Sequence, residues 1–78
     1  MEHPEKVFRR LESELRVYDP VGFSLLRALH RYYAENGKLC LEIPGNTLAA
    51  LVLQSTNFTS FLRSFSERHG NEVFLKII

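Results

Sequence analysis

The sequence predicts an α+β domain with the order α-α-β-β-α-β, in which a three-stranded sheet packs with three or four helices. Three observations support this prediction. Apolar residues recur at helical spacing in three segments, an Asn-Gly pair separates two β-prone runs, and the C-terminal run EVFLKII alternates along a strand. The 78 residues suffice for one small domain with one modest core. We take residues 1–78 as a single domain, and a strand that reaches the last residue is compatible with a fragment of a longer chain.

The first thirty residues predict two helices. Pro4 suits the first position of a helix that we expect to end near residues 16–18. Its apolar face consists of Val7, Phe8, Leu11 and Leu15. Asp19-Pro20 then starts a second helix, with Asp19 as the N-cap. The apolar stripe of this second helix consists of Val21, Leu25, Ala28 and Leu29.

Residues 31–43 predict a hairpin with a defined register. Asn36-Gly37 is typical of a two-residue turn, because both central positions need positive φ. Pairing outward from this turn places Glu35 opposite Lys38. The same register places Arg31 opposite Glu42, so both outer pairs join opposite charges on one face. The pairs between them are Ala34–Leu39, Tyr33–Cys40 and Tyr32–Leu41. The alternative is a second helix that extends to Tyr33 with Gly37 as its C-cap, and it gives the charge matching no reason to exist.

The last part of the chain predicts helix followed by strand. Pro44-Gly45 ends the hairpin, and Asn46 is expected to cap a helix that begins at Thr47. Because Ser55-Thr56-Asn57 offers a second set of capping residues, this helix is either kinked or divided into two. Gly70 is a typical stop before a strand over residues 72–78. The expected stripe consists of Leu48, Leu51 and Val52, followed by Phe58, Phe61, Leu62, Phe65 and His69.

Composition excludes several classes of protein. A net charge of +1 does not indicate a nucleic-acid or membrane partner, and the single Cys40 excludes an internal disulfide and favours a reducing cytoplasm. The histidines His3, His30 and His69 lack the paired spacing of zinc ligands. We therefore expect no metal, no cofactor and no catalytic residue.

The alternation of the strands predicts a second, outer face of the sheet. Tyr33, Cys40, Phe74 and Ile78 point away from the set assigned to the core. If helices cover only the other face, these four residues form an apolar and aromatic interaction surface. The alternatives are that a helix covers this face too, or that the core lies on this side. The candidate nucleic-acid contacts are Arg9, Arg10 and Arg31.

Three stretches carry a family resemblance: GFSLLRAL, ENGKLCLEIPGN and TNFTSFLRSFSERHGNEVFLKII. Together they resemble the KH-like small domains of bacterial replication proteins. The most similar is the domain after the ATPase region of the DNA polymerase III tau/gamma clamp-loader subunit, followed by the N-terminal domain of the initiator DnaA. The DnaA-type domain usually carries a tryptophan in its second helix, which this chain lacks.

The resemblance implies a non-catalytic, cytoplasmic docking domain whose partner is another replication protein, such as a polymerase or helicase subunit. It supplies no site residue that transfers to this chain. A nucleic-acid-binding KH domain needs a GXXG loop, whereas Gly45 is followed here by Asn46-Thr47-Leu48. Direct binding of single-stranded nucleic acid through the sheet aromatics is the alternative function, and a DnaA-type interaction domain is another.

Overall fold

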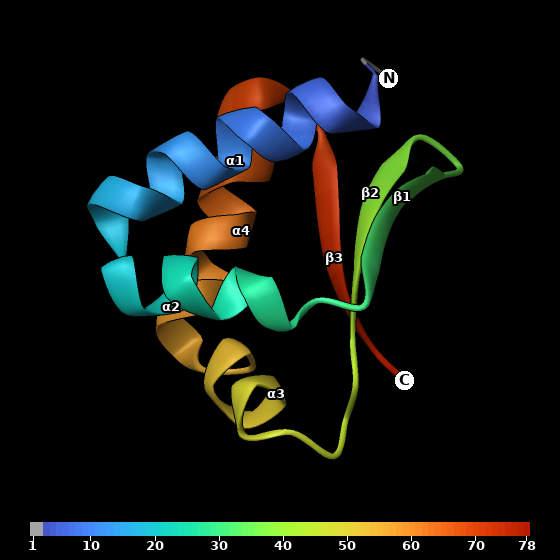
Figure 1. The fold of residues 1–78 in the computed structure, drawn as a ribbon. Helices are drawn as coiled ribbons and strands as arrows, with labels where there is room; N and C mark the ends of the chain where they lie inside the picture. Colours follow the sequence, from blue (N-terminus) through green and yellow to red (C-terminus); the bar gives the residue numbers. More distant parts are fainter. Residues whose placement is uncertain (1–2) are drawn as a thin grey trace.

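The computed structural model describes residues 3–78, which form four α-helices, one 3-10 helix and a three-stranded sheet. Figure 1 shows the helices gathered on one side of this sheet. The α+β prediction is thereby confirmed, and of the two alternatives for the segment between the last two strands the structure has two separate helices rather than one kinked helix. The elements are α1 (Pro4–Tyr18), α2 (Pro20–Leu25), the 3-10 helix η1 (Leu26–Ala28), β1 (Arg31–Glu35), β2 (Lys38–Ile43), α3 (Leu48–Leu53), α4 (Thr56–His69) and β3 (Glu72–Ile77).

The two N-terminal helices begin where the sequence predicts. Pro4 occupies the first turn of α1, and Asp19 caps α2 by accepting a hydrogen bond from the Gly22 backbone N–H at 3.1 Å. A Cβ atom at Gly22 would lie 2.6 Å from the Asp19 carboxylate, so glycine is what allows the cap to close. Val21 belongs to the predicted stripe but is 63% exposed, so its place in the stripe is wrong; Leu26 of η1 is buried instead.

The hairpin has the predicted register at all five pairs, from Arg31↔Glu42 to Glu35↔Lys38. Its turn residues Asn36 and Gly37 have φ angles of 52° and 75°, the conformation for which Asn-Gly is favoured. β3 then pairs in parallel with β2, so the sheet has the order β1-β2-β3 with β2 in the centre. The strand ends at Ile77, one residue before the predicted end, although the Ile78 N–H still donates to the Ile43 carbonyl at 3.0 Å.

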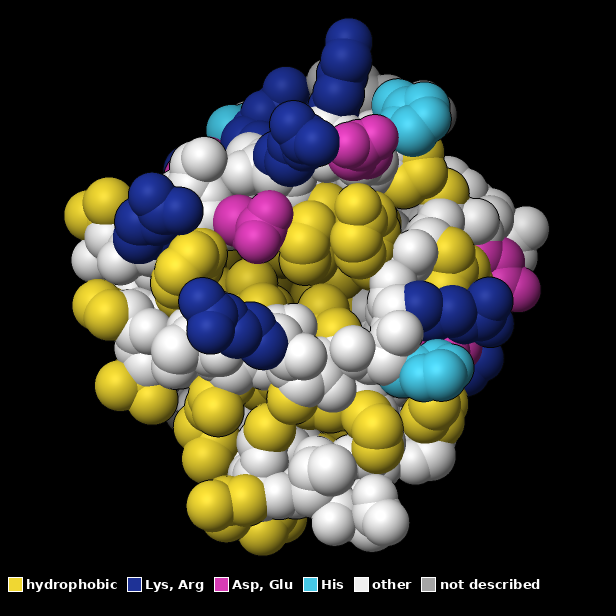
Figure 2. Space-filling view, viewed as in Figure 1, with side chains coloured by type: hydrophobic (Ala, Val, Ile, Leu, Met, Phe, Trp, Pro, Cys, Tyr) yellow, Lys and Arg dark blue, Asp and Glu magenta, His cyan; other side chains and the backbone are white. Residues whose placement is uncertain are grey.

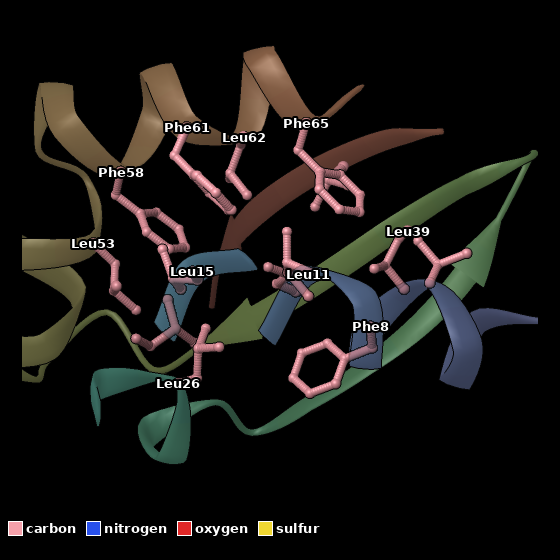
Figure 3. Packing of buried hydrophobic residues seen from close by; sticks show 14 of the residues in the cluster. Phe8, Leu11, Leu15, Leu26, Leu39, Leu53, Phe58, Phe61, Leu62 and Phe65 are labelled. Carbon is pink, nitrogen blue, oxygen red and sulfur yellow. The ribbon is translucent and has the colours of Figure 1, made fainter. Parts of the chain in front are cut away.

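The core lies between the sheet and the helices (Figure 3). The apolar face predicted for α1 is buried, with Leu11 and Leu15 fully inaccessible to solvent. α4 contributes aromatic side chains to the same cluster, and Gly70 ends this helix in the left-handed conformation, as predicted. The inner face of β2 completes the cluster with Leu39, Leu41 and Ile43.

The short helix α3 differs from the prediction in both its cap and its buried face. Thr47, not Asn46, is the N-cap, because its hydroxyl accepts from the Ala50 N–H and donates to the Pro44 carbonyl. Leu48 is 77% exposed and Leu51 68% exposed. The buried residues are Ala49, Ala50 and Leu53, so the predicted stripe of Leu48, Leu51 and Val52 is wrong. The sequence LAALVL is apolar on every side, and this leaves its orientation undetermined by pattern alone.

His69 continues the apolar stripe of α4 as predicted, and it also makes a polar contact with α1 that the sequence did not indicate. Its ring lies against Phe65, with 4.6 Å between the ring centroids, and its Nε2 atom is 2.5 Å from a carboxylate oxygen of Glu14. The other Glu14 oxygen lies 2.6 Å from the Arg68 guanidinium. Partial burial acts to raise the Glu14 pKa, but the hydrogen bonds with Arg68 and His69 together hold that pKa below 4.5. These polar contacts join α1 to the C-terminal end of α4.

Candidate functional site

The sheet has one face covered by helices and one face opposite them, which we call the open sheet face. Successive side chains of a strand point to opposite faces of the sheet. The residues of each strand that do not face the helices therefore lie on the opposite face. The open sheet face consists of Arg31, Tyr33 and Glu35 of β1, Lys38, Cys40 and Glu42 of β2, and Glu72, Phe74 and Lys76 of β3. Of the alternatives that the sequence left open, the structure has the one in which helices cover only one face of the sheet.

The strand register arranges these nine side chains in three rows across the sheet. The central row contains Tyr33, Cys40 and Phe74. The row on one side of it contains Arg31, Glu42 and Lys76. The row on the other side contains Glu35, Lys38 and Glu72. Charge therefore alternates in sign along both outer rows, and an aromatic–cysteine–aromatic row lies between them.

Glu42 is the most enclosed charged group of the open sheet face, with 5% of the residue exposed. Arg31 donates to its carboxylate through Nε at 2.8 Å, and Lys76 lies 4.0 Å away on the other side. The hydrogen bond from Arg31 is the main cause that lowers the Glu42 pKa, while desolvation opposes it and the Tyr33 hydroxyl adds to the lowering. A carboxylate that is paired in this way is a structural anchor of the face rather than a general acid or base.

The two aromatic rings of the central row are each approached by a cation. Arg31 lies 4.4 Å from the Tyr33 ring centroid, and Lys38 lies 4.8 Å from that of Phe74. Desolvation raises the Tyr33 pKa further above its usual range, which already lies well above neutral pH, so its hydroxyl is protonated. Phe74 nevertheless remains 44% exposed. It belongs to this row and is the most exposed apolar side chain of the three strands.

Two of the four predicted surface residues are placed differently from the prediction. Cys40 does belong to the central row, but it is only 9% exposed, so the flanking side chains cover it. Ile78 follows β3 and is 55% exposed, at the end of the sheet beside Gly45, whose N–H donates to the Ile78 carbonyl at 2.7 Å. The structure therefore brings Tyr33, Cys40 and Phe74 together and leaves Ile78 outside the row.

The three candidate nucleic-acid contacts are not brought together. Arg31 lies on the open sheet face, whereas Arg9 and Arg10 belong to α1, on the helical side of the sheet. Phe8 of the same helix stacks on Tyr32, which faces inward, with ring centroids 4.0 Å apart. Arg9 also pairs with Glu5 at 2.6 Å. These arginines do not form one basic stripe.

Sequence reasoning missed an apolar groove between the C-terminal half of α1 and the outer side of α4. Its volume is about 850 Å³, and it is lined by Ser13, Glu14, Val17, Tyr18, Ser60, Phe61, Ser64 and Arg68. Val17 is 84% exposed at its rim. The available signal was the Val17-Tyr18 pair, which follows the last buried position of α1 and has no place in its apolar stripe.

A second hollow lies between α1 and α2. Figure 2 shows hydrophobic side chains gathered there and basic side chains around them. Phe8, Glu12, Phe23, Leu26 and Arg27 line this smaller hollow of about 230 Å³. Within residues 3–78, no group of three or more His, Cys, Asp or Glu side chains is arranged to hold a metal ion. No helix in the described part of the chain is both long enough and apolar enough to cross a bilayer.

Comparison with known proteins adds no family assignment to this geometry. The chain matches no protein-family model, no curated protein and no solved structure. The fold and the arrangement of the open sheet face are therefore the basis for a functional proposal.

Proposed function

We propose that this chain is a non-catalytic docking domain that binds another protein through the open sheet face. The observation that carries the proposal is the central row of that face, where Tyr33 and Phe74 lie between two rows of charged side chains. Aromatic residues surrounded by a polar rim are typical of protein interfaces. The open sheet face extends over all three strands, which gives it the rigid backbone that a docking surface needs.

The charge balance of the face favours a protein partner over nucleic acid. Its three cations, Arg31, Lys38 and Lys76, are matched by three carboxylates, so its formal net charge is zero. The cations also have partners within the face, since Lys38 lies 3.7 Å from Glu72 and the other two flank Glu42. A surface that tracks a phosphate backbone requires an excess of positive charge. The arrangement of two aromatic rings on a sheet still favours single-stranded nucleic acid as the second candidate ligand.

The resemblance to small domains of bacterial replication proteins suggests what the partner is. We infer that it is a polymerase or helicase subunit of the bacterial replication machinery, in the manner of the tau/gamma subunit of DNA polymerase III. This assignment rests on the three sequence stretches that carry the resemblance and on the arrangement of two helices before a hairpin. It places the domain in the bacterial cytoplasm, with a DnaA-type N-terminal domain as the alternative.

The test is a calorimetric titration of the chain with purified bacterial replicative polymerase and, separately, with the replicative helicase. Phe74→Ala removes the most exposed ring of the central row and is expected to weaken binding about tenfold, the loss typical of an interface anchor. Val17→Ala is the matched control, because it removes an apolar side chain that is 84% exposed elsewhere. Binding that is insensitive to Phe74→Ala, or no binding by either protein, contradicts the proposal.

A parallel titration with a short single-stranded DNA separates the two candidate ligands. Nucleic-acid binding would fall steeply as salt is raised, because it releases counterions, and it would perturb the amide signals of Tyr33 and Phe74. Protein docking on a face of zero net charge is expected to depend only weakly on salt. Steep salt dependence together with those amide shifts would therefore replace the docking proposal by the nucleic-acid one.

A further inference from the structure

We propose that this chain self-associates into a two-fold symmetric dimer through the free edge of β1, which joins two sheets into one of six strands. β1 is a terminal strand of the sheet and pairs with β2 on one side only (Figure 1). All its residues are exposed except Tyr33, which is half-buried. An exposed edge strand offers unpaired backbone N–H and C=O groups to another strand.

The turn of the hairpin determines which backbone groups point outward. The first and last residues of a tight turn share a hydrogen bond, so Glu35 and Lys38 form a hydrogen-bonded pair. Hydrogen-bonded and non-hydrogen-bonded pairs alternate along an antiparallel ladder. Glu35, Tyr33 and Arg31 therefore direct their backbone groups toward β2, while Tyr32 and Ala34 direct theirs away from the sheet.

This alternation of backbone groups along β1 restricts how a second copy can pair with it. Outward-directed residues must face outward-directed residues, so an antiparallel pair of β1 strands is centred on residue 32, 33 or 34. Only the pairing centred on Tyr33 places Arg31 of each copy opposite Glu35 of the other. It also places Tyr32 opposite Ala34 on the inner face and the two Tyr33 rings beside each other on the open sheet face. The other two registers leave Arg31 and Glu35 without an opposite charge across the interface.

The sequence of charges on β1 is therefore self-complementary about Tyr33. Charged edge strands commonly prevent self-pairing through the repulsion of like charges, but here the two charges have opposite sign and lie symmetrically. In the dimer, the charges of the outer rows would continue to alternate in sign across all six strands. Tyr32, which is 36% exposed and stacked on Phe8, would cover the small Ala34 of the second copy.

The opposite edge of the sheet is less available. The Val73 N–H of β3 already donates to the Ser66 hydroxyl of α4 at 3.2 Å. Ser66 is half-buried, and its hydroxyl also donates to the Leu62 carbonyl at 2.9 Å. One of the backbone donors that a further strand would need at β3 is thus occupied.

A two-fold axis perpendicular to the sheet relates two antiparallel edge strands, so both open sheet faces would lie on the same side of the dimer. The dimer would thus present a docking face of twice the width. Because the contact consists of two five-residue strands and four aromatic rings, it is smaller than a standard stable interface. We therefore expect association only at high protein concentration.

The test is the mass of the chain in solution as its concentration is raised to about 1 mM, a range that detects weak dimers. The parent chain is expected to rise from 9.1 kDa toward twice that mass. Ala34→Pro removes an outward N–H without touching the ladder to β2, so it should remain at the monomer mass. Ala34→Ser is the matched control, because it keeps this N–H, and should associate like the parent.

A second variant fixes the register and does not depend on tolerance of proline. Tyr33→Cys in a Cys40→Ser background should oxidise to a disulfide-linked dimer, because only the register centred on residue 33 brings the two introduced thiols within bonding distance. The proposal is overturned if the parent chain stays at 9.1 kDa at every concentration, if Ala34→Pro folds and associates like the parent, or if the thiol variant does not cross-link. Growth beyond twice the monomer mass overturns it as well, since it indicates an open, head-to-tail contact.

Discussion

The orientation of α3 can be tested by replacing Leu53, which is fully buried between this helix and the core, with alanine. The substitution removes three carbon atoms, which corresponds to about 2.4 kcal/mol of transfer free energy at about 0.8 kcal/mol for each. The cavity left behind adds to this cost, so we expect a loss of about 3–4 kcal/mol. For a chain of this size that is a large part of the total free energy of unfolding, which is about 4–12 kcal/mol.

Leu51→Ala is the matched control in the same helix. Leu51 is 68% exposed, so the substitution should lose only about a third of the transfer free energy, roughly 0.8 kcal/mol. The higher helix propensity of alanine offsets part of this loss. Urea unfolding followed by circular dichroism measures both variants. With a slope of about 1 kcal/mol/M, the midpoint of Leu53→Ala should fall by about 3 M and that of Leu51→Ala by less than about 1 M. Equal losses, or a larger loss for Leu51→Ala, would refute the observed orientation and restore the stripe that the pattern predicts.

Two further predictions concern the turn and the contact between α1 and α4. Gly37→Ala should lower the free energy of unfolding by about 1–2 kcal/mol, because φ is +75° there and the added methyl group meets no atom within 4 Å, so backbone strain is its only effect. Asn36→Gly, at a φ of 52°, is the control and should change the free energy of unfolding little. Equal losses for the two variants in urea unfolding would contradict this interpretation. Because the Glu14 pKa is lowered in the folded state, its ionised carboxylate stabilises the fold at pH values above 4.5, the ordinary pKa. This contribution to stability is lost as the pH falls through the folded-state pKa. Unfolding measured from neutral to acidic pH should therefore show a steeper loss of stability for the parent than for Glu14→Gln, and identical profiles would show that the contact with Arg68 and His69 contributes nothing.

The hairpin could be predicted in full because its determinants are local. Asn36-Gly37 selects the turn, and the turn together with the charged pair Arg31 and Glu42 selects a single register. In α3 the same reasoning failed, because a run of six apolar residues contains no polar face to orient it. The cap failed for a related reason: Asn46 and Thr47 are both capable caps, and only the contact of Thr47 with Pro44 distinguishes them.

The open sheet face could be predicted only as one of three alternatives. Alternation divides the side chains of a strand into two sets, but it does not say which set the helices will cover. In β2 the two sets are both largely buried, so burial alone does not separate them either. The set with Leu39 and Leu41 faces the helices, while Glu42 is enclosed by neighbouring side chains of the sheet itself. The groove beside Val17 depends on how α1 and α4 pack, so the Val17-Tyr18 pair could mark only its rim on α1 and not the groove itself.

The way the open sheet face is shielded bears on what can bind it. An uncovered sheet with two aromatic rings exposes apolar area, and here cations lie over both rings while Glu42 holds Arg31 in position. This shielding reduces the exposed apolar surface and leaves Phe74 as its main remaining part. A partner that brings its own apolar group to Phe74 need not displace the network around Glu42. Such a partner would gain from burial of Phe74 and little from charge, which is why we expect binding to respond to Phe74→Ala more than to salt.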